Sequence, residues 1–248
     1  MKTERVVEVN NMNAIIDGTL ILSDINFHAL AGDITVILGR SGSGKTTLLK
    51  HLLGLYPTDR DAVSVLGKNP WHLDEKDEKD FYTRLGVFYQ NGALLGSMTV
   101  EENVALPLRQ HTSLPDEMIE RLVSLKLQLV NLGDAYYKLP SQLSGGMLKR
   151  AALARAIIMD PPLLFCDEPG AGLDPVSLAS LDELILNLKK LLDISVIIVT
   201  HEASSILRIA DRIVFIEDGT LLFEGDLEDA MSSSIKPVRE FFDKGRGK

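Results

Sequence analysis

Short hydrophobic runs alternate with segments of helical spacing along much of the chain. The runs at 34–38, 163–166 and 196–199 are typical of buried strands, because they are short, apolar and rich in aliphatic residues. Shorter runs at 6–9 and 20–22 also have strand character. This alternation predicts an α/β fold with a mainly parallel sheet.

Later segments add detail to this picture. From about 97 to 159 the spacing is helical and β-branched runs are lacking, which predicts a helical block inserted in the sheet. Asp218-Gly219 separates the strand candidates 212–216 and 221–223 and is a strong hairpin signal. Between 174 and 193 an aliphatic stripe predicts a helix that faces the core. The stripe consists of Leu178, Leu181, Ile185, Leu188 and Leu192.

Composition and charge narrow the classes of protein. The 248 residues are 45% hydrophobic and 25% charged, which is an ordinary balance for a globular protein. The net charge of -9 argues against bulk electrostatic binding of nucleic acid, so no nucleic-acid partner is expected. No stretch of the sequence approaches the roughly 20 apolar residues that cross a bilayer. The single cysteine, Cys166, excludes an intrachain disulfide.

A glycine-rich segment after the strand candidate 34–38 fits the phosphate-binding pattern G-x-x-x-x-G-K-[ST] and leads into a helical pattern. Its glycines let successive N–H groups curl around an anion, and the helix start adds unpaired N–H groups. Lys45 supplies a charge for the β- and γ-phosphates, and Thr46 a hydroxyl ligand for Mg²⁺. The expected nucleotide contacts are Gly39, Arg40, Ser41, Gly42, Ser43, Gly44, Lys45, Thr46 and Thr47.

Two carboxylates follow the strand candidate 163–166. Asp167 emerges at the strand end, where we expect it to hold Mg²⁺ directly or through water. Glu168 comes one residue later, where the chain changes face, and is expected to polarise the water that attacks the γ-phosphate. Glu168 as an ordinary turn carboxylate is the alternative, which its place in Asp-Glu-Pro disfavours.

Polar residues also follow two other strand candidates. Gln90 follows the run at 86–89, and His201 follows the run at 196–200. Because the carboxyl ends of parallel strands collect at one edge of a sheet, both side chains are expected near the phosphates. Gln90 would reach Mg²⁺ or the attacking water, and His201 would hydrogen-bond the γ-phosphate. A lone histidine is more often structural, but the neighbouring phosphate and metal motifs reverse that preference.

A second anion site precedes a later helical pattern. Ser144 is a good N-cap, and Gly145 and Gly146 leave backbone N–H groups exposed. A single ATP has no evident use for two such sites in one chain. Two copies arranged head to tail resolve this, because each nucleotide then lies between the phosphate loop of one copy and residues 144–146 of the other.

With these motifs in order, the chain resembles the nucleotide-binding domain of ABC transporters over essentially its whole length. The resemblance implies one domain, 1–248, with a RecA-like P-loop NTPase core at 1–90 and 160–248. It also implies an N-terminal antiparallel β subdomain and an inserted α-helical subdomain at 91–159. The motifs that carry it are the phosphate loop, Gln90, the signature 143–147, Asp167-Glu168, the loop 171–174 and His201.

The same resemblance implies roles for the site residues. It implies a homodimer that closes on two ATP molecules with Mg²⁺, opens on hydrolysis and drives membrane-embedded permease subunits. Lys45, Gln90, Glu168 and His201 are the implied catalytic residues, and the implied metal ligands are Thr46, Gln90 and Asp167. Ser144, Gly145 and Gly146 would contact the nucleotide of the partner copy.

A narrower resemblance lies in residues 91–112 and in a signature that ends in Met147 rather than glutamine. Both are similar to the ATPases of Mla-type phospholipid transporters, which work with MCE proteins. This implies a polytopic, MlaE-like permease faced by 91–112, a periplasmic MCE lipid-binding protein and, in some complexes, a STAS-domain subunit. It places the protein on the cytoplasmic side of the bacterial inner membrane, bound through the permease.

The chain departs from the family pattern near its N-terminus. Most relatives stack an aromatic ring on adenine there, whereas this chain has Ala14 at the corresponding position. Met12 and Ile16 are the apolar candidates for that contact. Other functions remain open: the ATPase of another ABC importer or exporter, a soluble non-transport ABC ATPase, or a nucleotide-gated module without turnover. One cassette with a net charge of -9 disfavours the non-transport ATPase, and the intact Glu168 and His201 disfavour the module without turnover.

Overall fold

The computed structural model describes residues 4–245, which form two compact units. Among the described residues, one unit comprises 4–78 and 195–245, and the other comprises Lys79–Ile194. The helical insert predicted at 91–159 lies wholly within the second unit, together with strands and a further helix. Both units combine helices with strands, which confirms the predicted α/β class.

The first unit contains an antiparallel sheet. Its strands are β1 (Arg5–Ile16), β2 (Thr19–Leu30) and β4 (Val63–Val65), in the order β2-β1-β4. A hairpin turn at Asp17 and Gly18, both with positive φ, joins β1 to β2. This sheet confirms the N-terminal antiparallel β subdomain.

A second sheet in this unit carries the central strand. Its strands β7 (Ser195–Val199), β3 (Ile34–Leu38), β8 (Arg212–Glu217) and β9 (Thr220–Asp226) lie in that order. The completely buried β3 runs parallel to β7 and β8, while β9 returns antiparallel to β8. The predicted Asp218-Gly219 turn is present, and both residues have positive φ.

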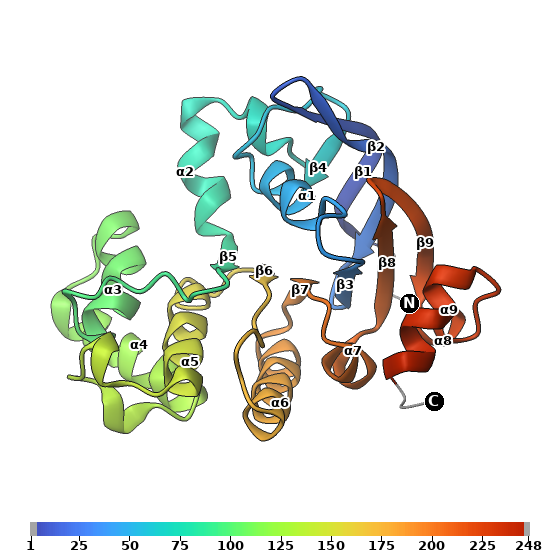
Figure 1. Ribbon diagram of the computed structural model, residues 1–248. Coiled ribbons are helices and arrows are strands. Elements are labelled where there is room, and N and C mark those ends of the chain that lie inside the picture. The colour runs from blue at the N-terminus through green and yellow to red at the C-terminus, as the bar shows by residue number, and fades with distance from the viewer. Residues whose placement is uncertain (1–3, 246–248) are drawn as a thin grey trace. The chain divides into compact units, whose positions relative to one another are not determined.

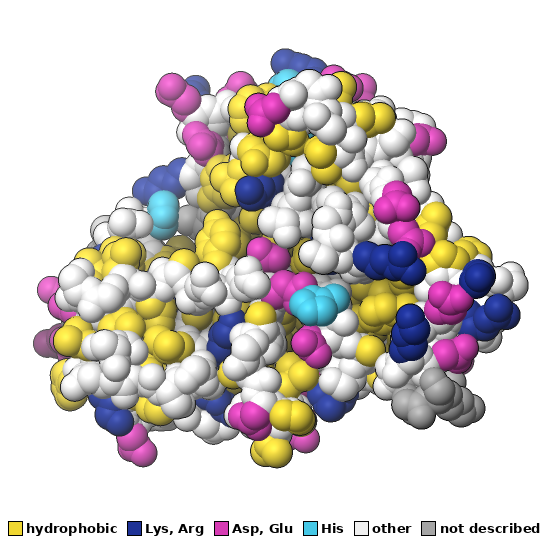
Figure 2. Space-filling model, viewed as in Figure 1, with side chains coloured by type: hydrophobic (Ala, Val, Ile, Leu, Met, Phe, Trp, Pro, Cys, Tyr) yellow, Lys and Arg dark blue, Asp and Glu magenta, His cyan; other side chains and the backbone are white. Residues whose placement is uncertain are grey.

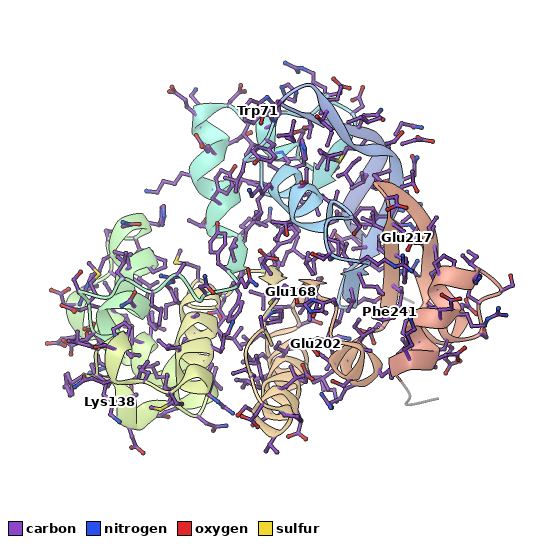
Figure 3. The ribbon with its side chains drawn as sticks, viewed as in Figure 1. Trp71, Lys138, Glu168, Glu202, Glu217 and Phe241 are labelled. Atoms are coloured by element: carbon purple, nitrogen blue, oxygen red, sulfur yellow. The ribbon has the colours of Figure 1, made fainter. Side chains whose placement is uncertain are left out.

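Helices surround the strands of the first unit (Figure 1). Phe241 packs edge-on against Phe215 of β8, with ring centroids 5.9 Å apart, which fixes the last helix on the sheet (Figure 3). The helices are α1 (Lys45–Leu52), α7 (Ala203–Ile209), α8 (Leu227–Met231), α9 (Lys236–Gly245) and the 3₁₀ turn η1 (Pro70–His72).

The second unit places helices beside a short parallel strand pair. β5 (Leu85–Phe88) and β6 (Leu163–Asp167) are parallel, with Phe88 opposite Cys166. The helices α3, α4 and α5 pack on one another, and α6 packs on α5 (Figure 1). Their bounds are α3 (Val100–His111), α4 (Asp116–Leu129), α5 (Gly145–Ala156) and α6 (Pro175–Leu192), with η2 (Gly133–Ala135) and η3 (Pro140–Gln142); α2 (Glu75–Thr83) begins in the first unit.

Local sequence explains where two of these helices begin. Thr99 and Glu102 form a capping box at the start of α3, so each side chain satisfies a free backbone N–H of the first turn. Asp174 accepts hydrogen bonds from two backbone N–H groups at the start of α6. The aliphatic stripe of α6 is buried as predicted, apart from Leu192, which is half-buried.

The surface is mixed in character. On the face shown in Figure 2, basic and acidic side chains interleave around α8 and α9. Among residues 4–245, no helix is both long enough and apolar enough to cross a membrane. The fold therefore offers no spanning segment within the described part of the chain.

The buried imidazole of His51 in α1 makes the stability of the fold sensitive to acid. Burial lowers its pKa below the ordinary 6.5, against opposing effects of the backbone at Pro57 and Tyr56. The unfolded chain binds this proton more readily, so the contribution of His51 to stability is fully present above pH 6.5 and is lost as the pH falls through the lowered pKa.

We expect His51→Leu to flatten this acid dependence. Unfolding by denaturant at about pH 7.5 and about pH 5.5 should show a smaller loss of free energy in the variant than in the parent. His111→Leu, at an exposed position of α3, is the control and should keep the parental dependence. An equal loss of unfolding free energy between the two pH values in His51→Leu and the parent would contradict this account.

Candidate functional site

The phosphate loop follows the end of β3, and at two of its glycines the backbone lies too close to its neighbours for a side chain. A Cβ at Gly39, where φ is +151°, would lie 1.9 Å from the carbonyl oxygen of Ile216 in β8. At Gly44 (φ +97°) a Cβ would lie 2.5 Å from the Leu22 side chain. Glycine is therefore required at both positions, as the motif predicts.

The loop ends as the N-terminal cap of α1. Gly44 is the N-cap and supplies no side-chain cap, so backbone N–H groups at this helix start are suited to an anion. Lys45 is buried, and its Nζ donates to the carbonyl oxygens of Gly39 and Arg40 at 2.9 and 2.8 Å. Arg40 itself pairs with Glu217 at the end of β8 (N···O 3.1 Å; Figure 3). These donors fit a phosphate group.

His201 follows the neighbouring strand at the same edge of the sheet. In the parallel pair β3–β7, Ile37 lies opposite Val199, and the Thr200 N–H donates to the Ile37 carbonyl at 3.2 Å. Gly39 and the exposed His201 thus follow from adjacent strand ends. The structure brings these two predicted site elements together within the first unit.

The second unit brings another three predicted residues together. Because Phe88 lies opposite Cys166, Gln90 leaves β5 at the edge where Asp167 and Glu168 leave β6. Both carboxylates are half-buried, and Gln90 is exposed. Their oxygen atoms are of the kind that Mg²⁺ prefers.

Glu168 occupies an unusual backbone position just past the end of β6 (Figure 3). Its φ is +44°, in the left-handed region that costs a non-glycine residue about 1–2 kcal/mol. Backbone strain of this kind is concentrated at functional sites. The thiol of Cys166, two residues before Glu168, is not a candidate nucleophile, because burial strongly raises its pKa.

The signature residues begin α5. The Ser144 hydroxyl accepts a hydrogen bond from the Met147 N–H at 3.3 Å, which confirms the predicted N-cap. Gly146 lines a cavity of about 240 Å³ with Leu173 and Val176, so the signature adjoins the loop 171–174. This arrangement lies wholly within the second unit.

Sequence reasoning did not assign a role to the cations of α5. Lys149 is buried, its Nζ donates to the Gln90 carbonyl oxygen, and it lies 5.5 Å from the ring centroid of Phe88. Burial lowers the pKa of Lys149, and the charges of Asp167 and Glu168 act in the opposite direction. The available signal was a set of three basic residues, Lys149, Arg150 and Arg155, in a helix otherwise made of small and apolar residues.

The proposed apolar contact to the base needs a correction. Met12 and Ala14 are both buried in the antiparallel sheet, where Ala14 lies opposite Leu22. Met12 therefore offers no surface to a nucleotide. Ile16, half-buried at the end of β1, remains the candidate.

The order and geometry of these elements agree with a comparison with known families. Residues 22–171, more than half of the chain, match the profile of the family described as ABC transporter. The chain belongs to the ABC transporter family. It is an ATP-hydrolysing subunit of the kind that this family uses.

Individual relatives support this assignment over nearly the whole chain. The chain is 37% identical to the intermembrane phospholipid transport system ATP-binding protein MlaF of Haemophilus influenzae, covering 96% of this chain and 90% of that one. It is also 37% identical to a probable ribonucleotide transport ATP-binding protein of Mycobacterium leprae, covering 97% and 69%. An ATP-binding cassette dimer with bound ADP and Pi is 27% identical, with a TM-score of 0.80 over 89% of this chain and 98% of that one.

We expect Gly39→Ala to impair nucleotide binding. The clash with the Ile216 carbonyl forces the loop to shift, at a cost of about 1–3 kcal/mol, and moves the N–H groups that hold phosphate. Titration with a fluorescent ATP analogue should show a dissociation constant raised at least about tenfold. Gly96→Ala is the control, because a Cβ there meets open space, and it should bind as the parent does.

Proposed function

We propose that this subunit couples ATP hydrolysis to phospholipid transport by a membrane permease. The observation that carries the proposal is the full set of ABC motifs combined with 37% identity over 238 residues to a protein named for phospholipid transport. The similarity to a ribonucleotide transport protein is equally high, which makes ribonucleotide transport the second candidate. Lipid or nucleotide bound to the purified transporter distinguishes the two.

The catalytic roles follow from the residues already located. Lys45 and the loop 39–46 hold the phosphates, and Thr46, Gln90 and Asp167 supply oxygen ligands for Mg²⁺. Glu168 polarises the attacking water, and His201 contacts the γ-phosphate. These residues are divided between the two units, which we propose act as one ATPase domain, with the second unit contributing Gln90 and both carboxylates.

The signature acts on the nucleotide of a second copy. Ser144, Gly145 and Gly146 present a capped helix start, and the related cassette with ADP and Pi was solved as a dimer. A two-fold dimer gives each nucleotide one phosphate loop and one signature. Each copy then completes the site of the other.

A groove in the second unit suits a permease. It has a volume of about 450 Å³ and lies between α3 and β5, with Tyr89, Leu106 and Arg155 in its lining. In the segment 94–98, which precedes α3, Leu95 is 43% exposed. The groove is lined in part by α3, and the backbone of Leu95 is hydrogen-bonded to Asn103 of the same helix. A groove of mixed polarity and an exposed leucine beside one helix fit a short helix of the permease.

The wider assembly follows the relatives. We propose that the ATPase pair binds an MlaE-like permease at the cytoplasmic side of the inner membrane, with a periplasmic MCE protein and a STAS-domain subunit as further partners. Support comes from the name of the Haemophilus relative, an intermembrane phospholipid transport protein.

Glu168→Gln tests the catalytic assignment. The amide keeps the shape of the side chain but cannot accept a proton, so turnover should fall by roughly 10²-fold or more. ATP should still bind, and size-exclusion chromatography with ATP should show an accumulated dimer.

Two further variants serve as controls for Glu168→Gln. Glu183→Gln, on the exposed side of α6, should hydrolyse ATP at the parental rate. Lys45→Ala should lose ATP binding itself, because it removes the phosphate-binding charge. Parental turnover by Glu168→Gln would remove Glu168 from the mechanism.

Leu95→Asp tests the docking surface. A charge on this exposed leucine should weaken assembly with the permease while the ATPase subunit still folds and binds nucleotide. Co-purification with the tagged permease measures the effect. Leu125→Asp, at a leucine of α4 that is 54% exposed, should assemble normally. Normal assembly of both variants would place docking elsewhere.

A further inference from the structure

Two cations of helix α5 donate hydrogen bonds to three carbonyl oxygens of the loop 90–93. The Lys149 ammonium donates to the Gln90 carbonyl oxygen. The Arg155 guanidinium donates to the carbonyl oxygens of Gly92 and Ala93 in the same loop, at 2.8 Å each. Between these cations, a Cβ at Gly92 would lie 3.2 Å from the Cβ of Ala152. Positions 149, 152 and 155 recur at three-residue spacing, so the loop lies along one side of the helix.

The loop has a shape that needs support. Gly92 and Ala93 both have positive φ, +71° and +49°, and Ala93 is a residue type that rarely adopts this conformation. The carbonyl groups in this region receive cationic donors, which make stronger hydrogen bonds than neutral ones. The two cations therefore stabilise a strained turn.

The same two cations are costly to bury. Lys149 is only 8% exposed, and burial lowers the pKa of the Arg155 side chain. An apolar side chain would fill either position without the free-energy cost of desolvating a charge. The benefit of cations at both positions therefore lies in their hydrogen bonds to the loop, which an apolar side chain could not make.

Helix α5 also connects the other functional parts of the second unit. It begins at the signature, with Ser144 as its N-cap. Arg155, near its other end, lines the groove of about 450 Å³. The residue whose carbonyl Lys149 holds, Gln90, stands at the strand edge beside Asp167 and Glu168.

We propose that Lys149 and Arg155 are positioning residues that fix the Gln90 loop to α5, so that signature, groove and Gln90 move as one body. Lys149 sets the backbone from which the Gln90 side chain reaches the reacting groups. Arg155 ties the same loop to the wall of the groove. The inference rests on the proposed ATP hydrolysis and adds to it the means by which the loop is held.

Steady-state ATP hydrolysis by the full-length chain tests the role of Lys149. We expect Lys149→Met to lower kcat by roughly 10–100-fold, the range for groups that orient residues of a site. The dissociation constant for a fluorescent ATP analogue should stay within about twofold, because the phosphate loop is untouched. Lys149→Arg should restore most of kcat, since guanidinium also donates to a carbonyl.

Amide hydrogen exchange separates positioning from simple stability. Exchange in residues 90–93 should accelerate in Lys149→Met, while the core of α5 stays protected. Lys126→Met is the matched control, because Lys126 is a lysine of the same unit, 3% exposed, that pairs with Asp160 instead of the loop. This control should lose stability without a change in kcat or in exchange of the loop.

Three results would overturn the inference. They are a parental kcat for Lys149→Met, a failure of Lys149→Arg to restore kcat, and an equal loss of kcat in Lys126→Met. Glu168→Gln distinguishes this failure from that of the proposed function. If Glu168→Gln abolishes turnover but Lys149→Met does not, only the positioning role is refuted; if Glu168→Gln turns over normally, the proposed mechanism is refuted as well.

Discussion

The contact of Gly39 with the Ile216 carbonyl is the constraint on which the site depends. It joins the start of the phosphate loop directly to β8, and the two backbones lie so close that no side chain fits at Gly39. The ion pair of Arg40 with Glu217 reinforces the same junction. Since backbone atoms make the main contact, the loop has few alternative conformations to lose when phosphate binds. The position of the α1 N-terminus follows from this junction.

Much of the fold was predictable because single strands carry their own signal. The buried strand at 34–38 appears with the predicted bounds, and the Asp-Gly hairpin is where the sequence places it. The first two strands are longer than the apolar runs at 6–9 and 20–22 indicate. Their polar middle part is held by side-chain hydrogen bonds, for example from Asn11 to Asp24 at 2.9 Å, which hydrophobic periodicity does not detect.

The site divides in the same way. The location of residues at strand ends could be predicted, because the direction of parallel strands alone places such residues at the edge of a sheet. This applies to Gln90, Asp167, Glu168 and His201. The contact from Lys149 to the Gln90 carbonyl joins residues 59 positions apart and depends on how α5 packs. The burial of the methionine at position 12 likewise depends on which face of its strand is covered. Neither could be read from local patterns.

The left-handed backbone at Glu168 has a consequence for how this protein varies. A glycine there would relieve about 1 kcal/mol of conformational cost and remove the carboxylate at the same time. If Glu168 polarises the attacking water as proposed, the more stable variant would be inactive, so a gain in stability at this position would cost activity. A laboratory selection for heat resistance alone would accordingly favour variants that carry glycine at this position and no longer hydrolyse ATP.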